Sequence, residues 1–465
     1  MQNQDSSREN LGSRLGFILL TAGCAIGLGN IWRFPFICGQ YGGAIFVLIY
    51  LFFLIALGFP VMVMELSLGR ASRRNIFGAY KTLAQDKRLK WHYPGAVFFL
   101  GNVVLMIFYT TVTGWMAAYA LKFATGAVSG LGAEGVGRHF GDFLANPVAM
   151  VGCMLFAVVF ATAICAIGLR KGVERITKLL MGCLFLLLVG LCIRALFLPG
   201  AAEGMRFYLW PNPASIEHVG ILKVIVEAMN QAFFTLSLGV GSIAIFGSYI
   251  DRDHTLPKET LAIVGLDTLV ALLAGVIIFP ACFSFGVSPD SGPGLVFVSL
   301  PNVFNVMHGG RFWGTLFFLF MSAAALTTVV AVFENIIAFL IDELRLGRTA
   351  ASLATGAGIA LLSLPCALGF NLLSDIHPMG GESTFLDLED YIVSGNLLPL
   401  GSLFIILFCA SSRGWGWKNF LAEANTGSGL RFPAALRLYV TVVIPILIAG
   451  LFLLGFAKQW FGFDI

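Results

Sequence analysis

An apolar stretch near the start of this chain is interrupted by glycines and polar residues. It begins as a membrane helix at Leu15, carries three glycines in seven residues, and continues with an amide, a guanidinium and a proline. These residues are Gly23, Gly27, Gly29, Asn30, Arg33 and Pro35. In hydrocarbon, loosened backbone and polar side chains are tolerated only where they line a cavity enclosed by protein. An unwound helix exposes carbonyls that can hold a cation and amides that can hold an anion, so the stretch predicts a binding site within a membrane.

The composition indicates a polytopic helical membrane protein. Of the 465 residues, 58% are hydrophobic and only 12% are charged, about half the charged share of soluble proteins. Eleven apolar runs are long enough to span a bilayer, which takes about 20 residues. They cover residues 13–38, 42–69, 93–124, 147–168, 175–198, 220–250, 259–286, 311–342, 350–370, 391–411 and 433–457. We therefore predict an all-α protein.

The basic residues predict the orientation of the spans. With the N-terminus in the cytoplasm, the inner segments hold about three times as many Lys and Arg as the outer ones, in agreement with the positive-inside rule. Eleven spans then place the C-terminal Asp464 and Ile465 outside a cell membrane. The net charge of +4 indicates no nucleic-acid partner. The nine cysteines fall in apolar runs without metal-ligand spacing and are expected to be small buried hydrophobes.

A second interruption lies in the sixth apolar run. Residues 231–242 contain Gly239 and Gly241 beside small hydroxyl residues. Close helix packing through small residues is the alternative for a single motif of this kind. The two interruptions lie five spans apart, however, as expected for paired broken helices of an inverted repeat. We expect a cytoplasmic tail at 1–12, a first repeat of five helices at 13–200, a second at 201–413 with an extracellular lid at about 287–310, and an extra helix within 414–465.

Three motifs resemble those of the neurotransmitter:sodium symporters. They are residues 27–35 (GLGNIWRFP), residues 233–239 (FFTLSLG), and residues 291–295 (SGPGL) with Leu300 and Pro301. The chain is similar to the family over nearly its whole length, and resembles the bacterial amino-acid transporters with eleven helices. The resemblance implies a five-plus-five inverted-repeat bundle of the LeuT type, with discontinuous helices 1 and 6.

The resemblance also implies two sodium sites. The first would use Ala25, Asn30, Thr235 and Asp267. The second would use Gly23, Ile26, Ala324, Thr327 and Thr328. Asp267 is unusual, because many relatives have Asn there; it would supply a fixed negative charge beside sodium. Chloride-dependent relatives bind an anion with the help of a Ser where this chain has Ala271, so we predict chloride independence. A protonated, structural Asp267 is the alternative.

The same resemblance implies a pocket for an amino acid. Its residues would be Cys24, Ala25, Gly27, Leu28, Gly29, Leu105, Tyr109, Phe234, Thr235, Ser237, Val240, Thr328 and Val332. Monoamine transporters have Asp at the position of Gly27, so a chain with glycine needs a substrate that brings its own carboxylate. Amides of the broken helix 1 would hold that carboxylate. The apolar walls favour neutral hydrophobic or aromatic side chains.

The remaining charges predict two gates. Arg33 and Asp390 would form the outer gate, with Glu389 and Asp387 as rival carboxylates. Arg8 and Asp342 would form the inner gate. Glu65, an acid inside the second run, is expected to bond the unwound sixth helix.

The leading hypothesis is a sodium-coupled amino-acid symporter that works by alternating access. A proton-coupled or exchange carrier of the same fold and a non-transporting amino-acid sensor are the alternatives. A membrane enzyme would need paired acids or a nucleophile constellation, and the sequence indicates neither. The expected partners are an amino acid, sodium and membrane lipid, with no organic cofactor.

Overall fold

The computed structural model describes residues 11–217, 219–287 and 294–461. Arg8, part of the predicted lid and the last four residues lie outside the described residues. The α-helices are α1 (Arg14–Ala25), α2 (Phe34–Gln40), α3 (Ala44–Phe53), α4 (Phe59–Ser72), α5 (Ile76–Leu83), α6 (His92–Thr125), α7 (Ala133–Leu144), α8 (Pro147–Ile167), α9 (Arg175–Leu196), α10 (Ala201–Leu209), α11 (Ile221–Thr235), α12 (Ser242–Gly247), α13 (Leu256–Phe285), α14 (Leu300–Val306), α15 (Gly310–Leu344), α16 (Arg348–Leu362), α17 (Leu364–Leu368), α18 (Phe385–Asp390), α19 (Leu398–Ala410), α20 (Trp417–Ala424) and α21 (Ile444–Phe461).

Shorter helical segments with other hydrogen-bond patterns join or extend these helices. The 3-10 segments are η3 (Lys87–Leu89), η5 (Pro213–Ile216) and η8 (Ala434–Leu436). The π-helical segments are η1 (Gly29–Arg33), η2 (Leu54–Gly58), η4 (Leu169–Glu174), η6 (Leu295–Ser299), η7 (Tyr391–Leu397) and η9 (Tyr439–Val443).

Proline accounts for most of the π-helical turns. Five of the six described ones are followed, after one residue, by a proline. Proline lacks an N–H and its ring clashes with the carbonyl four residues earlier, so the preceding turn widens. The prolines are Pro35, Pro60, Pro301, Pro399 and Pro445. The apolar runs of the sequence therefore continue as single spans with local wide turns.

The helical spans agree with the sequence prediction. Nine helices in the described part are long and apolar enough to cross a membrane, and α1 with η1–α2 forms a tenth span that is bent by 55°. The predicted sixth run is α11 and α12, which are individually too short to span and are separated by residues 236–241. Both predicted helix breaks are confirmed. The division of the chain into repeats at residue 200 remains a prediction.

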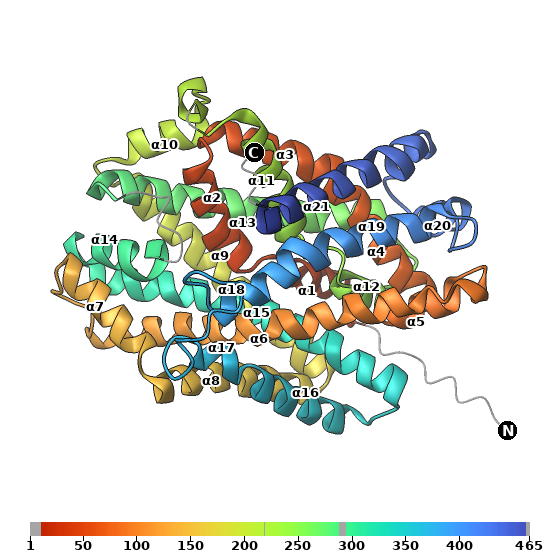
Figure 1. Ribbon diagram of the computed structural model, residues 1–465, viewed down its shortest axis with the longest axis horizontal. Helices are drawn as coiled ribbons and strands as arrows, with labels where there is room; N and C mark the ends of the chain where they lie inside the picture. Colours follow the sequence, from red (N-terminus) through yellow and green to blue (C-terminus); the bar gives the residue numbers. More distant parts are fainter. Residues whose placement is uncertain (1–10, 218, 288–293, 462–465) are drawn as a thin grey trace.

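The long helices α6 and α15 run side by side through the middle of the molecule (Figure 1). In the apolar stretch of α15 that could span a membrane, 89% is buried inside the protein, which makes α15 a central helix of the bundle. The segments α7, α10 and α14 lie at the left-hand end in Figure 1, and α5 and α20 lie toward the right. These short segments therefore lie at opposite ends of the bundle, as expected for connections between helices that cross a membrane in succession.

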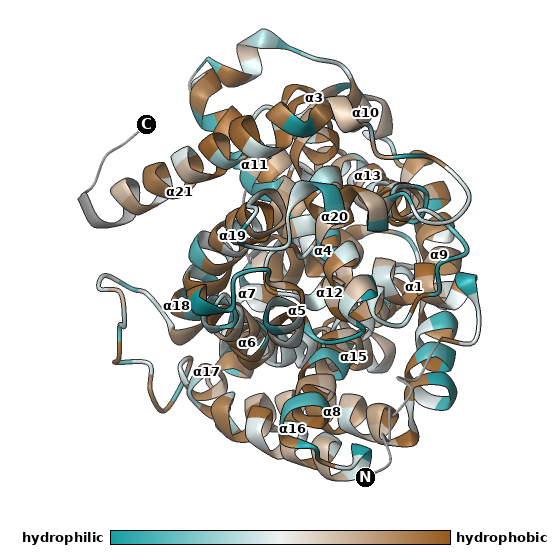
Figure 2. Ribbon diagram, turned by 90° about the vertical axis from the view of Figure 1, so that its right-hand side faces the viewer, coloured by the Kyte–Doolittle hydropathy of each residue, from teal (hydrophilic) through white to brown (hydrophobic). Residues whose placement is uncertain are grey.

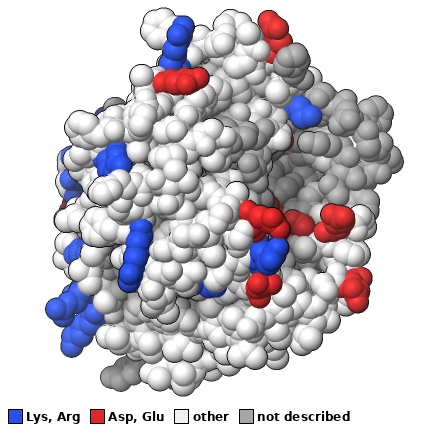
Figure 3. Space-filling model, turned by 90° about the vertical axis from the view of Figure 1, so that its left-hand side faces the viewer, with Lys and Arg blue, Asp and Glu red and all other residues white. Residues whose placement is uncertain are grey.

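The surface pattern is that of a membrane protein. Hydrophobic residues cover outer helices such as α21, whereas hydrophilic residues concentrate in the segments that connect helices (Figure 2). The end with α7, α10 and α14 shows a few acidic and basic side chains within a largely uncharged surface (Figure 3). Many large apolar side chains, such as Phe52 and Leu186, are exposed, as expected where lipid replaces water.

Candidate functional site

The break in helix 1 brings together three polar side chains from three helices. Asn30 Nδ2 donates to Thr235 Oγ1 at 2.9 Å and to Asp267 Oδ1 at 2.8 Å. Thr235 Oγ1 donates to Asp267 Oδ2 at 3.1 Å, and Asn30 Oδ1 accepts from the Gly27 N–H at 3.2 Å. All three side chains are fully buried. We call Asn30, Thr235 and Asp267 the first polar cluster. Ala25, the fourth residue predicted for this site, is the last residue of α1.

A second cluster of oxygens joins helix 1 to α15. Thr328 Oγ1 lies 3.2 Å from the Gly23 carbonyl oxygen, 3.3 Å from that of Ile26 and 3.4 Å from that of Ala324. Thr327 Oγ1 donates to the Ala324 carbonyl at 2.7 Å. The structure therefore brings together all five residues predicted for the second site. We call them the second oxygen cluster.

A small cavity of about 20 Å³, with room for about one water, lies at the two helix breaks. Ten predicted pocket residues line it: Cys24, Ala25, Gly27, Gly29, Leu105, Tyr109, Phe234, Ser237, Val240 and Thr328. Three others do not. The Leu28 N–H donates to Tyr109 Oη, and the Thr235 hydroxyl accepts from Asn30 Nδ2. Val332 is buried one helical turn beyond Thr328.

Sequence reasoning missed three residues of this region. Val393 and Leu398, from η7 and α19, complete the cavity wall. Gln231 Nε2 donates to the Gly29 carbonyl at 3.0 Å and so holds the broken backbone of helix 1. A polar amide in the middle of an apolar run was a usable signal for Gln231. Nothing in the sequence distinguishes Val393 and Leu398 from other apolar residues of the tenth span.

Gly27 is needed because two side chains approach its backbone closely. A Cβ at this position would lie 2.2 Å from Tyr109 Oη and 2.7 Å from Thr328 Oγ1. The Tyr109 hydroxyl also accepts a hydrogen bond from the Leu28 N–H at 2.9 Å. The position therefore excludes every side chain unless its neighbours move.

The break in helix 6 depends on left-handed backbone and on a buried carboxylate. Ser237, Gly239 and Gly241 have φ values of +52°, +96° and +81°. Glu65 Oε2 accepts from the Gly239 N–H at 2.9 Å and Glu65 Oε1 accepts from the Ile243 N–H at 3.1 Å. These bonds satisfy amides that the break leaves without helical partners. The structural role predicted for Glu65 is confirmed.

The predicted outer gate is not formed as an ion pair in this structure. The Arg33 guanidinium lies over the Phe234 ring, 4.3 Å from its centroid. Asp390 Oδ1 instead accepts from Ser394 Oγ at 2.6 Å, one turn along its own helix. Asp387, a rival carboxylate, caps α18 by accepting from Thr384. Glu389, the other rival, is 8% exposed, and within the described part of the chain its Oε2 has no hydrogen-bond partner.

The predicted inner gate is described for one partner only. Asp342 Oδ2 accepts from the backbone N–H of Asn75 at 3.1 Å and from its side-chain Nδ2 at 2.9 Å. Arg8 lies outside the described residues. The pairing of Arg8 with Asp342 therefore remains a prediction.

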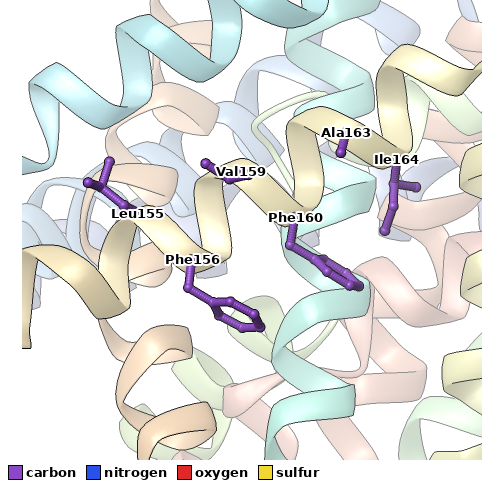
Figure 4. A pocket seen from close by; sticks show the side chains of 6 residues that line it. All are labelled: Leu155, Phe156, Val159, Phe160, Ala163 and Ile164. Atoms are coloured by element: carbon purple, nitrogen blue, oxygen red, sulfur yellow. The ribbon is translucent and has the colours of Figure 1, made fainter.

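A larger surface groove of about 470 Å³ lies on α8 and has a different character (Figure 4). It is lined by Leu155, Phe156, Val159, Phe160, Ala163 and Ile164. None of these six side chains has a polar atom, so the groove suits lipid chains and not a charged solute. The cavity at the helix breaks is the better candidate for function.

Comparison with known proteins assigns the chain to a family. Residues 8–129 and 140–460 match the sodium:neurotransmitter symporter family. An uncharacterized sodium-dependent transporter of Bacillus subtilis is 37% identical over 447 residues, which cover 95% of this chain and 96% of that protein. The chain belongs to the sodium:neurotransmitter symporter family. The crystal structure of MhsT in complex with L-phenylalanine matches with a TM-score of 0.86 at 37% identity, and the match covers 96% of this chain and 99% of that one.

More distant family members include eukaryotic transporters. The sodium-dependent serotonin transporter of Drosophila melanogaster is 28% identical over 73% of this chain and 60% of its own length. Membership confirms the LeuT-type fold and the resemblance found in the motifs. The protein is a multi-pass membrane transporter of a sodium-dependent family, and the members of this family are transporters, not enzymes.

Proposed function

We propose that this protein imports neutral L-amino acids with hydrophobic or aromatic side chains, coupled to sodium. The observation that carries the proposal is an apolar cavity at the two helix breaks, with the first polar cluster beside it. Thr328 both lines this cavity and belongs to the second oxygen cluster. The binding of L-phenylalanine by the similar MhsT supports the substrate class.

The ends of the substrate would be held by backbone and by Tyr109. The amides of Leu28 and Gly29 lie where helix 1 restarts, and N–H groups at a helix start favour a carboxylate. The Leu28 N–H, which donates to Tyr109 Oη in this conformation, would donate to the substrate instead. Carbonyls of Ala25, Phe234 and Thr235 would accept the ammonium group. Because the cavity holds only about one water in this conformation, the Phe234 ring and the facing wall must move apart on binding.

The two clusters fit hard cations to different degrees. The second oxygen cluster offers three carbonyls and two hydroxyls, and hard cations prefer oxygen ligands. In the first polar cluster Asn30 turns its Nδ2 toward Asp267, so a cation there would require the amide to turn its oxygen inward. Asp267, fully buried, would then balance the charge of the cation.

The proposed transport cycle is alternating access. Sodium would order the broken helices, the substrate would close the outer side around Arg33 and Phe234, and loss of sodium from the second oxygen cluster would open the inner side. The proposed orientation has a cytoplasmic N-terminus and an extracellular C-terminus, since the basic residues concentrate on the segments that this orientation places inside.

Uptake into proteoliposomes at clamped pH tests the proposal. We expect an inward sodium gradient to drive accumulation of a labelled apolar amino acid, with competition by Leu, Met, Phe, Tyr or Trp and none by Asp, Glu, Lys or Arg. Accumulation that follows a proton gradient at zero sodium would replace the proposal with proton-coupled transport. Saturable binding without any accumulation would replace it with an amino-acid sensor.

Chloride is expected to be dispensable. Replacing external chloride by gluconate should leave uptake unchanged, because Asp267 already supplies a negative charge within the first polar cluster and Ala271 offers no hydroxyl to an anion. Asp267→Asn should lower uptake about tenfold or more, since a buried cation would lose its counter-charge. A large loss of uptake in gluconate with the unchanged chain would contradict this prediction.

A further inference from the structure

The first turn of α1 lies between two buried carboxylates that belong to other helices. On one side, Glu174 accepts hydrogen bonds from the Gly12 N–H at 2.8 Å and from Ser13 Oγ at 3.1 Å. On the other side, Arg14 Nε donates to Glu259 Oε1 of α13 at 2.9 Å. Glu174 is 4% exposed and Glu259 is fully buried. The start of helix 1 is thus fastened to two neighbouring spans.

Gly16 makes the close approach of Glu174 possible. A Cβ on Gly16 would lie 2.1 Å from Glu174 Oε1 and 2.6 Å from its Cδ. Glycine is a poorer helix former than alanine, and here it stands in the first turns of a helix, where its N–H donates to Ser13 Oγ at 3.0 Å. The carboxylate packed against this position accounts for the glycine.

The fifth span, η4 with α9, is called helix five here, and it presents this carboxylate through a wide turn. The π-helical η4 begins after Gly168, whose φ is +121°, and ends at Glu174. Lys178 Nζ then lies 2.6 Å from Glu174 Oε1 and 2.8 Å from Ser13 Oγ. An anion beside a helix start is favourable because the first N–H groups have no partner within the helix. We call Gly12, Ser13, Gly16, Glu174 and Lys178 the helix 1 clasp.

The clasp is connected to the second oxygen cluster along α9. Thr177 lies three residues after Glu174, is 1% exposed, and has no hydrogen-bond partner for its Oγ1 among the described residues. A Cβ on Gly23 would lie 3.3 Å from Thr177 Cγ2 and 3.4 Å from Thr327 Cβ. Helices α1 and α9 lie side by side (Figure 2). Moving the start of α1 away from α9 would therefore uncover this side of the cluster.

We propose that Glu174 is a positioning residue of the inner gate, which closes the cytoplasmic side of the second oxygen cluster by clasping helix 1 to helix five. The inference rests on the proposed sodium-coupled transport and deepens it. Opening the gate requires the buried carboxylate to leave the Gly12 amide and Ser13. A cation in the second oxygen cluster binds α1 to α15 and so favours the clasped state.

Glu174→Gln is expected to raise the sodium concentration for half-maximal uptake about fivefold to tenfold, which corresponds to the loss of one ordinary hydrogen bond, since the neutral amide can still accept one of the bonds. Saturating sodium should restore most of the uptake, and Glu174→Asp should lie between the two. Glu134→Gln is the matched control, because Glu134 also pairs with a basic residue four positions later but its side chain is 88% exposed. An unchanged sodium requirement in Glu174→Gln would overturn the inference.

Gly16→Ala provides an independent test through a double-mutant cycle. In the unchanged chain the added methyl displaces the Glu174 carboxylate, and we expect the same rise in sodium requirement as for Glu174→Gln. In a Glu174→Ala background the obstacle is gone, and Gly16→Ala should change the sodium requirement less than twofold. Equal effects of Gly16→Ala in both backgrounds would show that the methyl acts elsewhere and would overturn the inference.

Hydrogen exchange of the first turn of helix 1 tests the clasp without any transport assay. In sodium, amides of residues 12–16 should exchange at least about tenfold faster in Glu174→Gln than in Glu134→Gln. Equal exchange would overturn the clasp even where uptake is intact. If exchange differs as expected but the unchanged chain takes up no amino acid with sodium, the proposed function fails and the clasp stands.

Discussion

Gly27→Asp is expected to reduce sodium-driven amino-acid uptake about 100-fold or more. The first added carbon would already lie 2.2 Å from Tyr109 Oη and 2.7 Å from Thr328 Oγ1, so both side chains must move. The added carboxylate would also occupy the region where the substrate carboxylate is proposed to bind. Overpacking and an uncompensated buried charge together cost several kcal/mol, and each 1.4 kcal/mol is about tenfold.

The measurement is initial uptake of a labelled apolar amino acid into proteoliposomes, normalised to reconstituted protein. Gly27→Ala isolates the steric part of the effect and is expected to lose less. Gly141→Asp is the matched control, since a Cβ at this exposed position of α7 meets no atom within 4 Å. Uptake by Gly27→Asp within threefold of the unchanged chain would contradict the proposed substrate position.

Thr328→Ala is expected to have the second largest effect on uptake, because this one hydroxyl lies within hydrogen-bond distance of three carbonyl oxygens. Thr328 Oγ1 contacts the carbonyls of Gly23, Ile26 and Ala324, and so joins the broken helix 1 to α15. Its removal takes a donor from the Gly23 and Ile26 carbonyls and one oxygen from the second oxygen cluster. We take the loss of one oxygen ligand from a cation as comparable to the loss of a hydrogen bond to a charged group, about 1.5–3 kcal/mol, so we expect the sodium requirement for uptake to rise about tenfold to 100-fold.

Thr328→Ser retains the hydroxyl and should keep most of the sodium affinity. Thr315→Ala is the control on the same helix, because the exposed Thr315 hydroxyl only bonds back to the Arg311 carbonyl at 2.7 Å. Sodium titrations of uptake and of thermal stability separate the loss of a ligand from general destabilisation. If Thr328→Ala and Thr315→Ala need the same sodium concentration for half-maximal uptake and for thermal stabilisation, the second oxygen cluster is not a sodium site.

Much of the candidate site could be predicted from the sequence. Asn30, Thr235 and Asp267 are polar side chains in apolar spans, where burial without partners is costly, and the resemblance in the motifs implied that they meet in one cluster. Glu65 followed the same logic, since the broken sixth helix leaves amides that need an acceptor. The resemblance in the motifs added the pairing of helix 1 with α15 through Thr328.

Other features depend on how helices meet and were missed or wrongly predicted. The predicted outer-gate ion pair is not formed in this conformation, because Ser394 Oγ donates to Asp390 Oδ1 within the same helix and the Arg33 guanidinium lies over the Phe234 ring. The contacts of Glu174 were not foreseen, since an acid near the end of a span is ordinarily a solvated residue. Only the tertiary structure places it against Gly12 and Gly16.

The sequence by itself determined the membrane class, the two helix breaks and the residues that gather there. Glycine, proline and buried polar groups constrain backbone within a few residues, and hydrocarbon tolerates them only in an enclosed site. The tertiary structure decided which carboxylate binds the residues before helix 1, which apolar residues close the cavity and whether Arg33 reaches Asp390. These contacts join residues more than 100 positions apart, and their distances follow from helix packing, which no local pattern specifies.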